Sequence, residues 1–317
     1  MPQAPNRKST PPAMQAPFDT ALIRRRRTRA AGGFAGFSFL KERVAAELAE
    51  RLLDANRSFA LGLDIGSHRG EVAGPLLATG RLETLLHADS AEGFARTAPR
   101  PSLVMDEERL AVADGSLDFA TSALALHRVN DLPGALIQIR RALRPDGLFL
   151  GALFGGETLT ELRTALGEAE AEMEGGMSPR VFPFADARDL GALMQRAGFA
   201  LPVVDADRHT VTYATPFALM RDLRGMGETN ALAERRRVPL RRATLMRMAE
   251  IYAARFSDPS GRVRATFQVI YLAGWRPHES QQKPLRPGSA AARLADALNT
   301  VERPAGEKAP GGRPSSR

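Results

Sequence analysis

The sequence predicts an α/β domain whose largely parallel sheet is covered by helices on both faces. Short apolar segments of strand length alternate with helix-like or turn-like segments, a pattern typical of parallel strands joined by crossovers. Acidic residues end three of the apolar segments in succession, at Asp64, Asp89 and Asp106. Since 44% of the 317 residues are hydrophobic, the chain can bury a full core, as one large domain or as a domain with insertions.

The first predicted elements are a helix, a strand, a turn and a second helix. Apolar residues recur at i, i+4 spacing over residues 40 to 53, which predicts an amphipathic helix that packs on the sheet. Phe59 to Ile65 is an apolar run of strand length. The glycine-bordered turn after it leads into an Ala- and Leu-rich helix that ends near Thr79, where Gly80 is the stop signal.

Strand-like and helix-like segments continue to alternate through the middle of the chain. Strands are expected over Thr84 to Asp89, Ser102 to Asp106, Leu117 to Leu126 and Leu148 to Phe154. A helix is expected over Asp131 to Leu143, between the last two strands. Asn130 or Asp131 can cap it, Pro133 suits its first turn, and residues 144 to 147 (RPDG) end it.

The last third of the chain is expected to be richer in helix. Helices are predicted over Thr158 to Glu174 and Ala187 to Ala197, extended chain with a bend over Pro202 to Tyr213, helical structure over residues 216 to 256, and a strand over Arg264 to Trp275. We interpret residues 216 to 256 as a helical insertion between the last two strands of one sheet.

Basic residues outnumber acidic ones and gather near the ends of the chain. Lys and Arg number 44 against 36 Asp and Glu, a net charge of +8, so anionic partners have to be considered. Arg24 to Arg27 form one run. We expect a disordered basic tail over residues 1–33, a folded domain over residues 34–288 and a second disordered tail over residues 289–317. The Arg-rich start is weakly compatible with an organellar transit peptide, although its prolines argue against an amphipathic helix there.

Several classes of site and protein are poorly supported. The chain has no cysteine, which excludes disulfides, thiolate metal sites and a cysteine nucleophile. Its five histidines show no metal-ligand spacing, so no metal is expected. No apolar run approaches the ~20 residues of a membrane-spanning helix, and no G-x-S-x-G nucleophile motif occurs. Aromatic residues make up 6% of the chain and offer few platforms for stacked bases, which disfavours nucleic acid as a substrate.

The loop in LGLDIGSHRG, residues 61 to 70, is the main candidate for a binding site. A phosphate-binding loop needs G-x-x-x-x-G-K-[ST] and a dinucleotide loop needs G-x-G-x-x-G, and neither pattern fits. The remaining pattern, the acid-x-G-x-G-x-G loop for S-adenosylmethionine, fits at Asp64, Gly66 and Gly70 and departs at His68. Histidine tolerates positive φ, provided that its side chain points outward.

The acids at the next two strand ends support a nucleoside-binding site. At Asp89 a carboxylate can accept hydrogen bonds from two ribose hydroxyls, and at Asp106 one can accept from the adenine amino group. Open α/β sheets bind ligands outside the carboxyl ends of their strands. The alternative is that such acids cap the following helices. The predicted residues for binding S-adenosyl-L-methionine as cofactor are Asp64, Gly66, Ser67, Gly70, Asp89, Asp106 and Glu107.

Longer segments of the chain resemble known families. LDIGSHRG, HADSAEG, LALHRVNDLPGALIQIRRALRPDG and LFGGETLTELR are similar to BioC-like class I methyltransferases. EAEMEGGMSPR, FALMRDLRGMGETN and RATFQVIYLAGWRPHESQQKPLRPGSA resemble the mitochondrial complex I assembly-factor family described as SAM-binding arginine hydroxylases. The resemblance covers about Phe39 to Ala290. It implies a Rossmann-like, seven-stranded class I methyltransferase sheet, and a protein substrate from the NADH dehydrogenase machinery.

The resemblance leaves the reaction open between methylation and hydroxylation of an arginine on a complex I subunit. The chain departs from the family at His68, in place of the loop glycine, and at Arg128, where the family tends to have tryptophan. Two other functions stay open: a small-molecule or acyl-carrier O-methyltransferase, and a non-catalytic assembly scaffold. A bacterial cytoplasm is favoured over a mitochondrial matrix, because the transit signal is poor.

Two residues are candidates for catalysis. His127 lies just beyond the fourth strand, matches the histidine of the family and could position or deprotonate a substrate. Its alternative role is a hydrogen bond to a backbone carbonyl. Glu157 follows Gly155 and Gly156 after the fifth strand and could hold a guanidinium group by a bidentate contact. Its alternative is a helix N-terminal acid that the helix dipole stabilises.

A second group of arginines lies inside the predicted helical insertion. It comprises Arg235 to Arg237, Arg241 and Arg242. Such a group could steer an acidic partner or RNA toward the mouth of the site. The alternative, which we favour, is a solvated helix face in an arginine-rich chain.

Overall fold

The computed structural model describes residues 16–281. The chain divides into two units, residues 1–278 and 279–317, and the second contributes only residues 279–281 to the described part. The fold given below is that of the first unit. The tail expected over residues 289–317 lies outside the described residues, as does the start of the N-terminal tail, residues 1–15.

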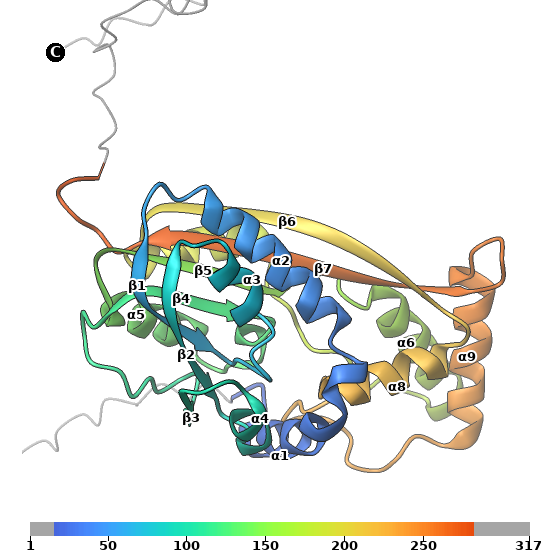
Figure 1. The fold of residues 1–317 in the computed structure, drawn as a ribbon. Helices are drawn as coiled ribbons and strands as arrows, with labels where there is room; N and C mark the ends of the chain where they lie inside the picture. Colours follow the sequence, from blue (N-terminus) through green and yellow to red (C-terminus); the bar gives the residue numbers. More distant parts are fainter. Residues whose placement is uncertain (1–15, 282–317) are drawn as a thin grey trace, which may run out of the picture. The chain divides into compact units, whose positions relative to one another are not determined.

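A mixed sheet of seven strands organises the described residues (Figure 1). The strands are β1 (Phe59–Ile65), β2 (Leu82–Asp89), β3 (Ser102–Val104), β4 (Leu117–Ala123), β5 (Leu143–Phe154), β6 (Ala200–Tyr213) and β7 (Val263–Trp275). Their order across the sheet is β3-β2-β1-β4-β5-β7-β6. Neighbours among the first five strands pair in parallel, and β7 runs antiparallel to both β5 and β6. The predicted fold class is confirmed.

Helices connect and cover these strands. They are α1 (Thr20–Ala30), α2 (Phe39–Leu53), α3 (Ala73–Ala78), α4 (Glu92–Thr97), α5 (Leu132–Ala142), α6 (Thr160–Glu174), α7 (Ala187–Arg196), α8 (Pro216–Met226) and α9 (Arg242–Phe256), with 3-10 turns η1 (Ala31–Gly36) and η2 (Leu126–Arg128). Local signals set several ends: Asp131 caps α5 by accepting a hydrogen bond from the amide of Gly134, at 2.8 Å. Among residues 16–281, no helix combines the length and apolar character needed to cross a bilayer.

Both faces of the sheet carry helices, as predicted. On one face, α2 buries Val44, Leu48 and Leu52 completely, in a core shared with α3. On the other face, α5 buries Leu136 and Ile139 in a core shared with α7. Because the strands are buried from both sides, the parallel part of the sheet reads as continuous apolar runs in the sequence.

The predicted insertion between the last two strands consists of α8, α9 and a connecting segment. Residues 227–241, between the two helices, are not helical, so the expected helical stretch is interrupted. Figure 1 shows β6 and β7 extending beyond the other strands, with α6, α8 and α9 gathered near their far end. The bend expected in β6 occurs at its start: Leu201 has φ of +50°, and the register with β7 shifts between Ala200 and Val203.

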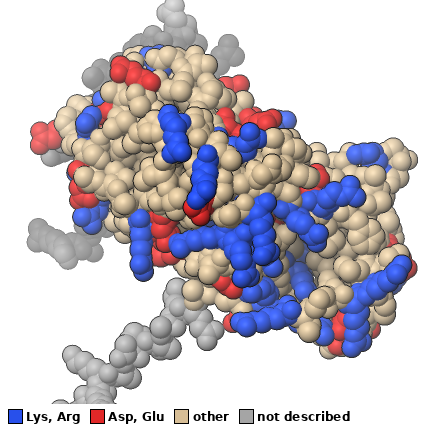
Figure 2. Space-filling view, turned by 60° about the horizontal axis from the view of Figure 1, so that its bottom comes forward, with Lys and Arg blue, Asp and Glu red and all other residues tan. Residues whose placement is uncertain are grey.

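The disordered tail expected over residues 1–33 is wrong for residues 20–33, which form α1 and the first half of η1. Asp19 caps α1 by accepting a hydrogen bond from the Leu22 amide at 3.0 Å. Leu22 and Ile23 are buried in a small core with Phe182 and Leu232. This helix could not be recognised from its apolar pattern, because its buried apolar residues are only Leu22 and Ile23 and a run of arginines follows them. Figure 2 shows a face of the molecule on which Lys and Arg side chains gather.

Candidate functional site

The loop after β1 has the backbone conformation that its glycines predict. Gly66 and Gly70 have φ of +70° and +88°, in the left-handed region that side chains disfavour. A Cβ at Gly66 would lie 2.2 Å from the Cβ of Ala125, and one at Gly70 would lie 2.5 Å from Cδ of Pro99. Both glycines are therefore required by close approach as well as by φ.

His68 shares the left-handed conformation, with φ of +53°, but its side chain points inward. Its ring is 3% exposed and lies between Phe34 and Phe94, at centroid distances of 5.0 and 4.8 Å. The expected outward orientation is wrong, because η1 and α4 enclose the loop on this side. Burial, and then the charge of Lys41, hold the pKa of His68 well below its usual value, so the ring is neutral at pH 7.

Lys41, from α2, ties the loop to β4 and was not predicted as a site residue. Its buried Nζ lies 2.6 Å from Nδ1 of His68 and donates to the carbonyls of Gly66 and Ala123 at 3.0 and 3.1 Å. Burial lowers the pKa of Lys41. The only sequence signal was a lysine on the otherwise apolar stripe of the first predicted helix.

Asp64 and Asp89, at the carboxyl ends of β1 and β2, are both fully buried. Asp64 places Oδ2 3.3 Å from Nδ1 of His87, and its Oδ1 has no partner among the described residues. Asp89 accepts hydrogen bonds from the backbone amides of His68, at 2.9 Å, and of Ala91, at 2.8 Å. Ala91 is the N-cap residue of α4, and no side chain caps the first turn of this helix, so the alternative that Asp89 caps the following helix is not what the structure shows.

Two arginines of α1 form ion pairs with the acids that were expected to bind a nucleoside. Arg27 donates to Oδ2 of Asp89 at 2.5 Å, and both side chains are fully buried. Arg24 donates to Oδ2 of Asp106, also at 2.5 Å, and this pair is partly exposed. The two arginines are three residues apart and therefore lie on one face of the helix.

Ser67 and Glu107 complete the predicted cofactor set. Ser67 is fully buried, with its hydroxyl 3.4 Å from the carbonyl of His68. Glu107 accepts a hydrogen bond from the Ser90 hydroxyl at 3.0 Å. Burial, and then the charge of Asp89, raise the pKa of Glu107. The structure thus brings all seven predicted cofactor residues to the same edge of the sheet, at the carboxyl ends of β1, β2 and β3.

His127 belongs to a second polar cluster, with Arg128 and Glu228. Glu228, which follows α8, accepts from Nη1 of Arg128 and lies 3.3 Å from Nε2 of His127. The His127 ring packs on Phe154 at a centroid distance of 4.8 Å. Sequence reasoning missed Glu228, although it lies in the segment FALMRDLRGMGETN that carries the family resemblance.

The protonation of this cluster follows from burial and charge. Burial lowers the pKa of His127, so its ring is neutral at pH 7. Burial alone would raise the pKa of Glu228, but the charge of Arg128 and the contact with His127 bring it to about 2. A carboxylate can only accept, so Nε2 of His127 donates to Glu228 and its lone pair lies on Nδ1. That Nδ1 is buried and has no partner among residues 16–281.

Glu157, the second candidate for catalysis, lies apart from this cluster. Its side chain is 46% exposed and forms an ion pair with Arg208 of β6. Its backbone amide donates to the side chain of Gln268 at 3.1 Å. The acid beside His127 is Glu228 instead, which lies 101 residues further along the chain than His127.

An apolar pocket adjoins the His127 cluster. Its volume is about 230 Å³, and its walls include Phe154, Phe184, Leu223 and the carboxylate residue Glu228. Phe154 and Glu228 also line a cavity of about 20 Å³, and Lys41 and His68 line the same cavity. The two residues thus form a wall between the apolar pocket and the glycine loop.

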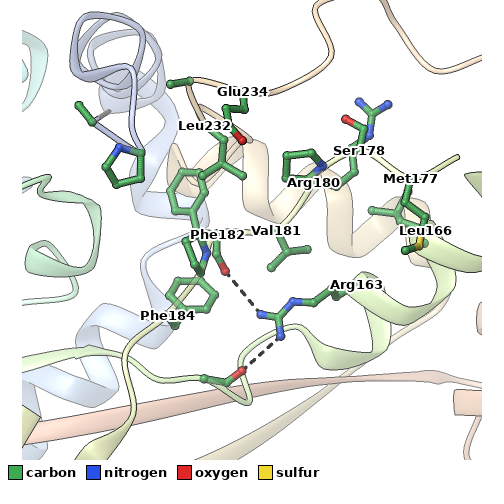
Figure 3. A pocket seen from close by; sticks show the side chains of 17 residues that line it. Arg163, Leu166, Met177, Ser178, Arg180, Val181, Phe182, Phe184, Leu232 and Glu234 are labelled. Atoms are coloured by element: carbon green, nitrogen blue, oxygen red, sulfur yellow. Dashed lines mark hydrogen bonds between the residues drawn. The ribbon is translucent and has the colours of Figure 1, made fainter. Parts of the chain in front are cut away.

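A larger pocket of about 730 Å³ lies beyond the apolar pocket (Figure 3). Phe182 and Phe184 line both. Arg163 of α6 reaches under this pocket and donates to the carbonyls of Gly156 and Phe182, both at 3.5 Å. The apolar pocket is the one beside the candidate chemistry, because Glu228, which contacts His127, lines it and does not line the larger pocket.

The predicted residues fit S-adenosylmethionine in type and in place. The left-handed glycines form a cradle that a Cβ would fill, and Asp64 keeps one buried oxygen without a partner among the described residues. The cavities beside the loop, however, measure about 20 Å³ each. Arg27 takes up the space next to Asp89, so a nucleoside can reach this acid only when α1 moves. No group of three or more His, Asp or Glu within the described part of the chain is placed to hold a metal ion.

Comparison with known proteins identifies relatives along most of the chain. The family model described as a methyltransferase domain matches residues 37–202. Arginine-hydroxylase NDUFAF5, mitochondrial, from Homo sapiens is 43% identical over 291 residues, covering 90% of this chain and 84% of that protein. Malonyl-[acyl-carrier protein] O-methyltransferase from Halorhodospira halophila is 36% identical over 266 residues, covering 81% and 88%. A crystal structure from Bacillus halodurans, described as that of a methyltransferase, has a TM-score of 0.51 at 14% identity, covering 74% of this chain and 99% of that one.

Proposed function

The chain belongs to the methyltransferase-domain family and to the family of the arginine-hydroxylases NDUFAF5, and we therefore propose that it binds S-adenosylmethionine and modifies a protein substrate in respiratory complex I biogenesis. The modification is methylation, in which S-adenosylmethionine gives up its methyl group and leaves as S-adenosylhomocysteine, or arginine hydroxylation, which also needs dioxygen and a two-electron reductant. The observation that carries this proposal is the 43% identity over 90% of the chain, which extends beyond the methyltransferase domain.

Asp89 and Asp106 are the residues that we assign to the ribose and the adenine. The loop glycines let the backbone approach the nucleoside, and Lys41 holds the loop by its bonds to two carbonyls. When bound, the cofactor supplies an electrophilic methyl group on a sulfonium. Because such a methyl group is transferred in line, the protein contributes chiefly by alignment of the substrate and by exclusion of water.

Glu228 and His127 are the residues that we assign to the substrate side chain. A guanidinium entering the apolar pocket meets one carboxylate there, Glu228, which already binds the guanidinium of Arg128. Glu228 orients the neutral His127 ring, and Nδ1 is left as the atom that can accept a proton from the substrate. The aromatic wall of Phe154 and Phe184 keeps water from this atom.

Mass spectrometry of complex I subunits can test the proposed reaction. Subunits are purified from a strain that lacks the gene and from the same strain with the gene restored. We expect one arginine-containing peptide to carry an added oxygen, or an added methyl group, only when the gene is present. Arginine peptides of identical mass in both strains would contradict the proposal.

A second candidate function is O-methylation of an acyl-carrier substrate, and it is supported by the 36% identity to a malonyl-[acyl-carrier protein] O-methyltransferase. A direct assay separates it: purified protein is incubated with S-adenosylmethionine and a malonylated acyl-carrier protein. Methyl ester formation would support this second function.

A calorimetric titration with S-adenosylmethionine addresses the scaffold alternative, since a protein without affinity for the cofactor is not an enzyme of this type. We propose a bacterial cytoplasm as the location of the protein. The alternative is a mitochondrial matrix, which is supported by relatives that are themselves described as mitochondrial.

A further inference from the structure

A groove lined by arginines opens beside the apolar pocket. Its volume is about 1010 Å³, and nine of its lining residues are arginines: Arg25, Arg26, Arg29, Arg180, Arg221, Arg224, Arg235, Arg236 and Arg237. No Asp or Glu is among the residues that line it. We call this feature the arginine groove. Figure 2 shows the concentration of Lys and Arg on this face.

Four separate parts of the chain build the arginine groove. One group of arginines comes from α1, a second from α8 and a third from the segment that connects α8 to α9, and Arg180 comes from the segment between α6 and α7. The backbone is fixed at these points: Arg26 donates to the carbonyl of Asn230, and Gly225 of α8 packs so closely on Phe37 that a Cβ would lie 2.3 Å from its ring. The fold thus holds the positive charges together, so they are not a chance run in a flexible tail.

Several of these charges lack a counter-charge within the chain. Arg180, Arg235 and Arg236 pair with Glu170, Asp19 and Glu174. Among residues 16–281, Arg25, Arg29, Arg221, Arg224 and Arg237 form no ion pair, and all five are exposed. The closely spaced positive charges repel one another: burial, and then the charges of Arg235 and Arg25, lower the pKa of Arg26. An anionic ligand would offset this repulsion.

The arginine groove is continuous with the apolar pocket that contains Glu228. Arg180, Arg224, Thr229 and Asn230 line both. A chain lying in the groove can therefore place one side chain past Arg224 and into the pocket. This continuity connects the positive surface to the candidate substrate site and argues against a merely solvated helix face.

We propose that the arginine groove binds an acidic segment of the protein substrate, next to the side chain that enters the apolar pocket. This inference rests on the proposed function. Guanidinium groups match carboxylates in bidentate geometry, and Asp and Glu side chains along an extended segment can reach several arginines at once. Single-stranded RNA fits less well because the lining contains one aromatic residue, Phe37, for stacking. A membrane surface fits less well because the positive charges lie in a concave groove.

Peptide binding by the full-length protein tests this proposal. The probes are a fluorescent peptide with Asp and Glu flanking one arginine, the same peptide with Asn and Gln in their place, a single-stranded RNA, and vesicles containing phosphatidylglycerol. The double variant Arg25→Glu with Arg221→Glu reverses two groove charges outside the apolar pocket. The matched control, Arg188→Glu with Arg196→Glu, reverses two exposed charges on α7.

We expect wild type and the α7 control to bind the acidic peptide, and the groove variant to bind it at least about tenfold more weakly. The affinity should fall as salt is raised. Equal affinity for the neutral peptide, unchanged affinity of the groove variant, or tighter binding to RNA or vesicles that the groove variant loses would each overturn the proposal.

A second measurement separates this proposal from the proposed function. Affinity for S-adenosylmethionine is measured in parallel for wild type and for both double variants. Peptide binding that depends on the groove, together with absent cofactor binding, would overturn the enzyme and leave the groove assignment standing. In the strain lacking the gene, the groove variant should restore less of the modification than the α7 control does. Full restoration would overturn the groove.

Discussion

Glu228 is the residue on which the candidate chemistry depends. It is the carboxylate beside His127, it lines the apolar pocket, and it balances the buried charge of Arg128. Its side chain comes from after α8, far in sequence from the strand ends that were expected to carry the site. Its importance could not be predicted from spacing, because the contact to His127 exists only once the insertion folds back over η2.

Replacing Glu228 with Gln should abolish the modification and leave the cofactor affinity within about threefold. The amide keeps the shape but removes the charge opposite Arg128, so the free energy of unfolding should also fall by about 3 kcal/mol. Glu157→Gln is the matched control, because Glu157 is an exposed acid that lies apart from His127. Activity that survives Glu228→Gln but is lost in Glu157→Gln would show that the earlier expectation for Glu157 was right.

The depressed pKa of Glu228 also predicts a pH dependence. A carboxylate whose folded pKa of about 2 lies below the usual value of 4.5 stabilises the protein above about pH 4.5 and loses that contribution as the pH falls toward 2. Arg128, His127 and Arg27 are the charged or titratable groups that act on it. Acid unfolding of wild type and Glu228→Gln should therefore converge in this window. Parallel curves down to pH 2 would argue against the assignment.

His68→Gly tests the loop itself. The backbone already has φ of +53°, which glycine adopts without strain, so the loop conformation should persist. The variant loses a buried ring packed between Phe34 and Phe94, and stability should fall by about 2 kcal/mol. Cofactor affinity should be preserved or become tighter. A folded His68→Gly protein without measurable affinity for S-adenosylmethionine would show that this turn is not a cofactor loop.

Helix α1 is the element in which the sequence misled most. The sheet, α2, α5 and β7 could be placed within a few residues because apolar periodicity, caps and turn residues mark them. α1 could not, because its helical face is formed by arginines whose acidic partners come from β2 and from after β3. Long-range ion pairs leave no local pattern in a sequence, so Arg27 looked like part of a solvated run.

Replacing Arg27 with Met tests the closure of the site by α1. We expect cofactor affinity to rise by about tenfold, because Asp89 no longer has a competing partner. Stability should fall by about 3 kcal/mol, because Asp89 stays buried without a counter-charge. Arg25→Met, on the other face of α1, is the control and should change neither quantity strongly. Weaker cofactor binding in Arg27→Met would mean that Arg27 holds Asp89 in its binding geometry instead of blocking it.

Hydrogen exchange tests the same closure without a substitution. Since α1 has to leave Asp89 and Asp106 when a nucleoside enters, its amides should exchange faster in the presence of S-adenosylmethionine. Amides of α2, which packs on the sheet, should be unchanged or slower. Slower exchange in α1 on cofactor binding would indicate that the helix closes over the ligand.

At the scale of the whole molecule, one sheet supports two neighbouring functional regions. The residues that we propose for cofactor binding lie at the ends of β1, β2 and β3, in the order in which the acids occur along the sequence. The apolar pocket and the arginine groove depend on α8 and on the segment before α9, whose arrangement the sequence left open. Strand order follows from local signals and chain topology, whereas this arrangement depends on packing between distant side chains.

α1 contributes to both of these regions from opposite faces. Arg24 and Arg27 hold the acids after β3 and β2, whereas Arg25, Arg26 and Arg29 line the arginine groove. A single helix therefore borders both proposed binding regions, so we expect an acidic segment bound to its outer arginines to change how its inner arginines hold Asp89 and Asp106. Thermodynamic linkage makes this coupling reciprocal, so the factor by which a bound peptide changes cofactor affinity must equal the factor by which the cofactor changes peptide affinity.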